Sequence, residues 1–208
     1  MEHMIFVVGI GPGHPDYVLP AVRKRIEQAE VLVGGRRALT DFAGPQQQTM
    51  VIAGDIASVL DYIRQSVRDK DVVVMVSGDP GYYSLLDALR RVFPVEQLQV
   101  IPGISSVQFA FARLALPWHD ARLLSMHGRR PPAEELAYRP GDMLGILTDA
   151  VCHSRSIPEM LLQAGWPEDA EVYICARLSY EDETILHTSL RGAMTEEKFT
   201  HCVMVVKA

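Results

Sequence analysis

The sequence predicts an α/β protein made of two α/β domains, and three observations support this prediction. In the first half, short apolar runs alternate with segments whose apolar residues have helical spacing. Around Pro117, in the stretch LALPWHDARLL, this alternation stops, so we place a domain boundary there and expect domains of residues 1–116 and 117–208. In the second half, strand-like segments follow one another closely, which is typical of a mixed or antiparallel sheet.

The first half predicts a mostly parallel sheet covered by helices. Strands buried on both faces are expected at four short apolar runs: residues 5–9, 31–35, 71–77 and 98–102. Helices are expected after or between them, over residues 17–30, 56–69, 83–93 and 105–115. The second of these helices has apolar residues at the spacing of a buried helix face: Ile56, Val59, Leu60, Ile63 and Val67.

The second half predicts one helix among several strands. The helix covers residues 157–165 and ends at Gly165. The stretch GRRPPAEE, residues 128–135, has the composition of a loop. Strands are expected over residues 122–126, 141–149, 171–179, 183–190 and 201–208.

The composition is that of an ordinary globular protein. The chain has 208 residues, of which 48% are hydrophobic, and a formal net charge of −6. This acidic balance argues against a nucleic-acid or membrane-surface binder. No apolar run approaches the roughly 18 residues of a membrane span, so we expect none, and the cytoplasm is the expected location. The three cysteines form no C-x-x-C motif, so we expect buried reduced thiols and no metal site.

Three expected strands of the first half end in loops of small residues. These loops are GIGPGHPDY (9–17), SGDPGYYS (77–84) and PGISSVQ (102–108). Ligands of open α/β sheets bind beyond the carboxyl ends of the strands, and glycine lets the main chain come close to a ligand. The sequence therefore predicts a ligand-binding crevice made largely of main chain.

The same loops do not fit a phosphate-binding site. No Gly-Lys pair occurs, as a P-loop needs, and a dinucleotide fingerprint fails because His14 stands at its third glycine position. Pro12 has no N–H to offer an anion. Asp79 would repel phosphate but would suit an amino group or a sulfonium. Alternatively, Asp79 starts a turn that Pro80 and Gly81 complete.

The blocks GIGPGHPDY, VSGDPGYYS, PGISSVQ and MHGR, in this order and spacing, resemble the tetrapyrrole methylases of corrin and sirohaem synthesis. The resemblance covers nearly the whole chain and implies two α/β domains with S-adenosylmethionine (SAM) in the cleft between them. Within the family, the sequence most resembles members that methylate C5 of precorrin-7, or of its cobalt form, in cobalamin synthesis. It also implies a homodimer, and a separate protein for the C15 methylation and decarboxylation that some members carry in a second domain.

The resemblance assigns cofactor contacts residue by residue. The implied positions are Pro12, Ser77, Gly78, Asp79, Tyr82, Ser105, Ser106, Leu147 and Leu178. Two positions of the first loop depart from the family pattern. His14 is often acidic there, and Leu19 replaces a threonine that commonly precedes the helix, which weakens its N-cap by about 1 kcal/mol.

The implied substrate carries many carboxylates, which arginine binds with two parallel hydrogen bonds. Two arginine pairs in glycine-containing loops are candidates for this role, although solvated surface charge explains each pair equally well. They are Arg36-Arg37 and Arg129-Arg130. Gly11 and Asp16 of the first loop are further substrate candidates, with capping or packing as the alternative role for Asp16.

Methyl transfer from a sulfonium needs no nucleophile from the enzyme, so holding the substrate carbon in place and excluding water should dominate catalysis. For proton handling the candidate is His127, which follows an expected strand. The alternative is a turn histidine that is hydrogen-bonded locally.

Three other functions stay open at this point. The chain could be a SAM-dependent methyltransferase acting on another tetrapyrrole position, on RNA or on protein, although its acidity counts against RNA. It could be a nucleotide-binding oxidoreductase, which the failed fingerprint disfavours, or an inactive module that binds a small molecule. No motif ligates cobalt, so the sequence leaves open whether the substrate carries that metal.

Overall fold

The computed structural model describes residues 3–208, which form two compact α/β units as predicted. The first unit ends at Ser105 and the second begins at Ser106. This division lies one helix before the boundary expected near Pro117. That helix, α5 (Ser106–Arg113), belongs to the second unit because its buried residues Val107 and Phe111 pack against the second sheet.

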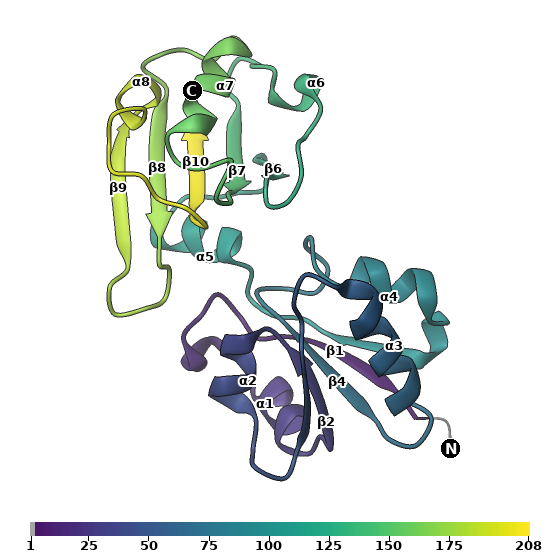
Figure 1. The fold of residues 1–208 in the computed structure, drawn as a ribbon. Coiled ribbons are helices and arrows are strands. Elements are labelled where there is room, and N and C mark those ends of the chain that lie inside the picture. Colours follow the sequence, from purple (N-terminus) through teal and green to yellow (C-terminus); the bar gives the residue numbers. More distant parts are fainter. Residues whose placement is uncertain (1–2) are drawn as a thin grey trace. The chain divides into compact units, whose positions relative to one another are not determined.

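The sheet of the first unit is entirely parallel, with the strand order β3-β2-β4-β1-β5 (Figure 1). Its three inner strands, with the sequences VLVG, VVVMV and IFVVG, are buried along their whole length, as expected of strands covered on both faces. The strands are β1 (Ile5–Gly9), β2 (Val31–Gly34), β3 (Gln48–Val51), β4 (Val72–Val76) and β5 (Leu98–Ile101).

Helices of the first unit cover both faces of this sheet. Successive residues of a strand point to opposite faces, so Ile5 joins the core under α3 while Phe6 joins the core under α1. Leu19 stands at the N-cap of α1 and makes no capping hydrogen bond with its side chain, consistent with the expected weak cap. The helices are α1 (Pro20–Glu27), α2 (Arg36–Phe42), α3 (Ile56–Ser66), α4 (Leu86–Val92) and the short 3₁₀ helices η1 (Pro15–Tyr17) and η2 (Val95–Gln97).

The helix α2 and the strand β3 were not expected from the sequence. The helix begins directly after Gly35, so Arg36 and Arg37 are its first two residues and do not lie in a loop. Arginine, alanine and leucine are good helix formers, and the helix buries Ala38 and Leu39 against the sheet. The expectation that the first arginine pair lies in a glycine-containing loop was therefore wrong.

The sheet of the second unit is mixed, as predicted, with the order β6-β7-β10-β8-β9. Strands β6 and β7 are parallel, and the other neighbouring strands are antiparallel (Figure 1). The strands are β6 (Arg122–Ser125), β7 (Met143–Leu147), β8 (Glu171–Ala176), β9 (Thr184–Ser189) and β10 (Val203–Lys207).

Helices also lie on both faces of the second sheet. One face forms the core with α7, while α5 lies against the other face at Gly145. A β-carbon at Gly145 would lie 2.9 Å from the Phe111 ring, so glycine permits this close approach of helix and sheet. The remaining helices are α6 (Ala133–Leu136), which begins inside the segment 128–135 expected to be a loop, α7 (Ser156–Gln163) and α8 (Leu190–Ala193).

The three cysteines are free and buried, as expected. Burial raises the pKa of the Cys175 thiol to about 12 and also raises the pKa of the Cys202 thiol, so both remain protonated at neutral pH. Within residues 3–208, no cluster of three or more His, Cys, Asp or Glu residues could hold a metal ion. Over the same residues, no helix is both long and apolar enough to cross a membrane.

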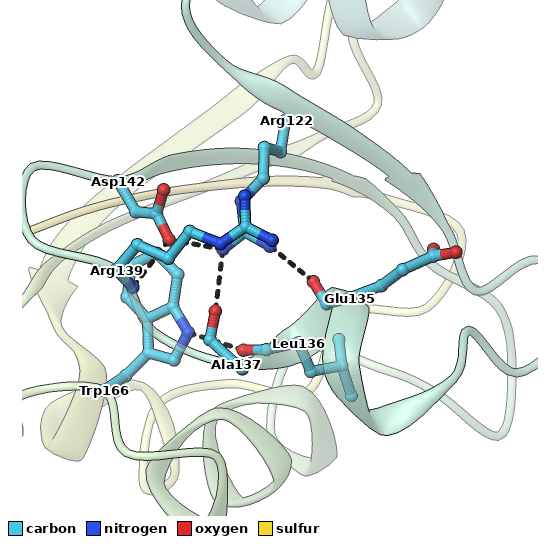
Figure 2. Close-up of polar contacts among 7 residues, drawn as sticks. All are labelled: Arg122, Glu135, Leu136, Ala137, Arg139, Asp142 and Trp166. Carbon is cyan, nitrogen blue, oxygen red and sulfur yellow. Dashed lines mark hydrogen bonds and ion pairs between the residues drawn. The ribbon is translucent and has the colours of Figure 1, made fainter.

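An arginine anchors the connection between β6 and β7, residues 126–142. Figure 2 shows the Arg122 guanidinium among the groups of this connection. It donates hydrogen bonds to the carbonyl of Glu135 at 2.7 Å and to the carbonyl of Ala137 at 3.0 Å. It also pairs with the carboxylate of Asp142, which accepts the N–H of Arg139 at 2.8 Å. The far end of the connection is therefore fixed by Arg122 and Asp142.

Replacing this arginine should destabilise the second unit. Arg122→Met leaves two carbonyls without their guanidinium donor and removes the ion pair of Asp142, so we expect the free energy of unfolding to fall by about 1–3 kcal/mol. Both tryptophans, Trp118 and Trp166, belong to the second unit, so tryptophan fluorescence during urea unfolding reports on it. The control is Arg191→Met, which removes an exposed ion pair and should cost less than about 1 kcal/mol. Equal unfolding midpoints for the two variants would show that the anchor contributes nothing.

Candidate functional sites

The loops after β1, β4 and β5 pack on one another main chain against main chain. A β-carbon at Gly9 would lie 2.5 Å from the carbonyl oxygen of Gly78 and 2.6 Å from the amide nitrogen of Gly103. A β-carbon at Gly103 would lie 2.3 Å from that same carbonyl oxygen. We call Gly9, Gly78 and Gly103 the glycine cluster. Because backbone atoms cannot rotate aside, side chains at Gly9 and Gly103 would force these loops apart.

Polar main-chain contacts join the same loops. Gly11 and Gly78 form an antiparallel bridge, with N–H···O distances of 2.8 and 3.3 Å, and both have positive φ, at 77° and 70°. The Asp79 carboxylate accepts the N–H of Gly81 on Oδ1 at 2.8 Å and the N–H of Gly103 on Oδ2 at 3.0 Å. Asp79 therefore forms the turn considered above and also ties the second loop to the third.

The second loop presents polar and aromatic groups beside this tie. Ser77 is exposed at the end of β4, and Tyr82 is half-buried, with burial raising the pKa of its phenol. The ring of Tyr83 lies 4.7 Å from that of Tyr82 in an edge-on arrangement. Tyr83 has φ of 52°, a left-handed conformation that is uncommon for a bulky residue and often occurs in functional loops.

The first loop is shaped by a histidine cap. His14 precedes η1, and its Nδ1 accepts the N–H of Asp16 at 3.3 Å. The carboxylate of Asp16 is exposed and lies 3.6 Å from the same nitrogen. Pro12 is half-buried in this loop. The capping role weighed for Asp16 thus involves its main chain, and its side chain faces solvent.

In the second unit, the ends of β6, β7 and β8 share an edge of the sheet with the start of β10. Val203, the first residue of β10, pairs with Leu147 on one side and with Cys175 on the other. The segments that follow β6, β7 and β8 therefore gather at this edge with the segment that precedes β10. We call these segments, residues 126–130, 147–152, 176–179 and 200–202, the second-unit rim.

The rim brings two histidines together. The rings of His127 and His201 are 5.7 Å apart, and both residues are exposed. Nδ1 of His127 lies 3.4 Å from the carbonyl oxygen of Thr148. The buried Thr148 hydroxyl donates to the Cys202 carbonyl at 2.9 Å and accepts the Cys202 N–H at 2.8 Å, which joins the segments after β7 and before β10. His201 also has φ of 53°, outside the usual range.

The other predicted site residues belong partly to the first unit and partly to the second. Arg129 and Arg130 are in the rim, where the guanidinium of Arg130 contacts Sγ of Cys152. The pair Arg36-Arg37 belongs to the first unit and is exposed on α2. Leu147 is half-buried at the end of β7, and Leu178 is buried after β8. Ser105 is buried at the end of the first unit, and Ser106 begins α5 in the second.

Comparison with known proteins identifies the family. The family model of the Tetrapyrrole (Corrin/Porphyrin) Methylases matches residues 4–193. The chain belongs to this family. It is 36% identical over 162 residues to a cobalt-precorrin-7 C(5)-methyltransferase of Salmonella typhimurium, covering 78% of this chain and 79% of that relative.

Solved structures agree with this membership. A precorrin-6Y methylase of cobalamin synthesis from Archaeoglobus fulgidus has a TM-score of 0.74 at 28% identity, covering 99% of this chain and 97% of that one. A uroporphyrin-III C-methyltransferase from Thermus thermophilus, complexed with S-adenosylhomocysteine, has a TM-score of 0.75 at 21% identity, covering 98% and 91%. This tetrapyrrole methylase thus belongs to a class of enzymes that take their methyl group from SAM.

The three loops of the first unit fit a cationic methyl donor. Residues 9–17, 77–84 and 102–106 contain no lysine or arginine, whereas they include the carboxylates of Asp16 and Asp79. A sulfonium and an amino group are favoured by such surroundings, whereas a phosphate is not. The exposed Ser77 hydroxyl adds a hydrogen-bonding group to the main chain around the glycine cluster.

Sequence reasoning missed several residues of these sites. Gly9 and Gly103 lie in quoted loops, but their packing against Gly78 cannot be foreseen from spacing. Asp149 is the last residue of the strand expected over 141–149, a signal that was visible in GILTD. His201 carried no signal, because only the pairing of β10 with β7 places it near His127.

Proposed function

We propose that this tetrapyrrole methylase transfers a methyl group from SAM to C5 of precorrin-7, or of its cobalt form, in cobalamin synthesis. The observation that carries this proposal is the 36% identity, across most of both chains, to a relative with that activity. The Archaeoglobus structure, which is 28% identical over nearly the whole chain and is named as a methylase of cobalamin synthesis, supports the same pathway for this chain.

The first unit supplies the main part of the SAM site in this proposal. The loops joined by the glycine cluster and Asp79 hold the donor through Pro12, Ser77, Gly78, Asp79, Tyr82 and Ser105, with Ser106, Leu147 and Leu178 as further contacts. SAM supplies an activated methyl group on a sulfonium. The chain's own task is to keep the loops in one arrangement, so that the methyl group is presented to the substrate in a single geometry.

The second-unit rim handles the substrate. As the new carbon–carbon bond forms, the carbon–sulfur bond breaks and its electrons stay on sulfur. The macrocycle gains one positive charge, which it loses by releasing a proton. His127 is the proposed acceptor: with the proton on Nδ1, beside the Thr148 carbonyl at 3.4 Å, Nε2 is free to accept another.

Arginines of this chain bind the carboxylates of the macrocycle. Arg129 and Arg130 of the rim are both candidates, and the guanidinium of Arg130 also contacts Sγ of Cys152. Arg36 and Arg37 stay candidates on the exposed face of α2, and Gly11 and Asp16 on the first loop. In this proposal the enzyme works as a homodimer, and a separate protein methylates C15 and removes the carboxyl group.

Calorimetry separates this function from a nucleotide-dependent one. The purified protein should bind S-adenosylhomocysteine and not NADH, because its loops lack the phosphate-binding features. Incubation with SAM and precorrin-7, with or without cobalt, should then add one methyl group by mass, and the faster form identifies the natural substrate. Binding of NADH alone would overturn the proposal, and methylation of another tetrapyrrole but neither form of precorrin-7 would replace its substrate.

A further inference from the structure

The carboxylate of Asp149 has different partners on its two oxygens. Asp149 lies two residues after the end of β7. Its Oδ1 accepts the N–H of Val151 at 2.8 Å and the N–H of Cys152 at 2.6 Å, which closes a turn next to Asp149 itself. Its Oδ2 accepts the N–H of Gly128 at 2.9 Å, from the loop after β6. One side chain therefore joins two segments of the second-unit rim.

The residue that Oδ2 holds sits between two proposed substrate-facing residues. Gly128 lies between His127 and Arg129, and its φ of 66° favours glycine. The charge of Asp149 is suited to these neighbours: the pKa of its carboxyl is lowered, chiefly by the Gly128 N–H, with smaller contributions from Arg130 and His127. The carboxylate therefore remains ionised at neutral pH.

We propose that Asp149 is a positioning residue, which holds the loop from His127 to Arg129 in the arrangement that binds and methylates the tetrapyrrole. The inference rests on the proposed function, because it assigns to this loop a role in substrate binding. Asp149 acts through the Gly128 N–H. A loop held at one amide keeps the His127 ring beside Thr148 and limits the conformations of Arg129, so less entropy is lost when the substrate binds.

The rest of the connection does not depend on Asp149. Residues from Glu135 to Asp142 are anchored by Arg122, as Figure 2 shows. Thr148 is tied to Cys202 by its own hydrogen bonds. Loss of the Asp149–Gly128 hydrogen bond therefore frees a short part of the rim while the sheet beneath it stays in place.

The isosteric variant Asp149→Asn separates the two roles of this carboxylate. Asparagine has one carbonyl oxygen, which can keep both bonds of the local turn, while its NH₂ group then faces the N–H of Gly128 and cannot accept from it. We expect KM for the tetrapyrrole to rise about ten-fold, with kcat also reduced. The affinity for S-adenosylhomocysteine should change less than about two-fold, because the loops of the glycine cluster are untouched.

A second readout does not need the substrate. In Asp149→Asn, hydrogen exchange at the Gly128 amide should become at least about ten-fold faster, while amides of β6 and β7 keep their protection. The matched control is Asp55→Ala, which removes the carboxylate that caps α3 by accepting the Ser58 N–H. This control should lower the melting temperature with no change in KM.

The outcomes separate this inference from the proposed function. Unchanged exchange at Gly128 in Asp149→Asn overturns the inference whatever the enzyme methylates. Faster exchange with wild-type KM and kcat also overturns it, because the tie would then be structural only. A wild-type protein that methylates neither form of precorrin-7 overturns the proposed function. In that case the inference, which assigns the loop to this substrate, is overturned with it, even if exchange shows that the tie exists.

Discussion

Replacing Gly103 by alanine should abolish binding of S-adenosylhomocysteine and destabilise the first unit by about 3 kcal/mol, near the upper end of overpacking costs. The new β-carbon would lie 2.3 Å from the Gly78 carbonyl oxygen and 2.7 Å from the carbonyl carbon and oxygen of Gly9. These are main-chain atoms of two other loops, so no side-chain rotation relieves the contact. The three loops must move apart, and with them the groups proposed to hold the cofactor.

The control for this variant is Gly54→Ala. Gly54 is also in the first unit, but a β-carbon there would have no atom within 4 Å. Far-UV circular dichroism during urea unfolding gives the stability of the whole chain, tryptophan fluorescence gives that of the second unit, and calorimetry gives the affinity. If Gly103→Ala unfolds and binds like Gly54→Ala, the glycine cluster does not shape the cofactor site.

Asp79→Asn should raise the dissociation constant for S-adenosylhomocysteine about ten-fold, equivalent to ~1.4 kcal/mol. Asparagine can keep a bond to either Gly81 or Gly103, but not to both, because its NH₂ group cannot accept an N–H. If the asparagine oxygen stays with Gly81, the second and third loops lose their side-chain tie; in either orientation one amide of the pair is left without its acceptor. Titration calorimetry on the folded variant measures the change.

Stability data decide how Asp79 acts. If Asp79 acts by joining the loops, the free energy of unfolding of the first unit, measured in urea, should fall by about 1 kcal/mol together with the loss of affinity. A loss of affinity at unchanged stability would instead assign the carboxylate to direct contact with the cofactor. Asp61→Asn, which alters an exposed pair on α3, should change neither quantity. Wild-type affinity in Asp79→Asn would contradict both roles.

The sequence was most informative where burial is complete. The runs IFVVG and VVVMV are apolar at every position, which is typical of a strand covered on both faces. The loops after these strands could be placed at one sheet edge because parallel strands end together. In contrast, β3 is only partly buried, because Gln48 and Thr49 are exposed. Its four residues therefore show no clear periodicity of burial.

Contacts between distant segments were the part that the sequence could not provide. The approach of Gly9 to Gly103 depends on the pairing of β1 with β5, and each glycine alone suggests only a turn. The bond from Asp149 to Gly128 spans 21 residues and requires that β6 and β7 end at one edge. A carboxylate at a strand end was a visible signal, but its partner was not.

The position of the transferred methyl group tests most directly whether this tetrapyrrole methylase acts on C5, as we propose. The wild-type protein would be incubated with precorrin-7, with and without cobalt, and with SAM labelled with ¹³C in its methyl group. NMR of the product should show one labelled methyl group, bonded to C5. A labelled methyl group on any other carbon, or no transfer by a protein that binds S-adenosylhomocysteine, would contradict the account.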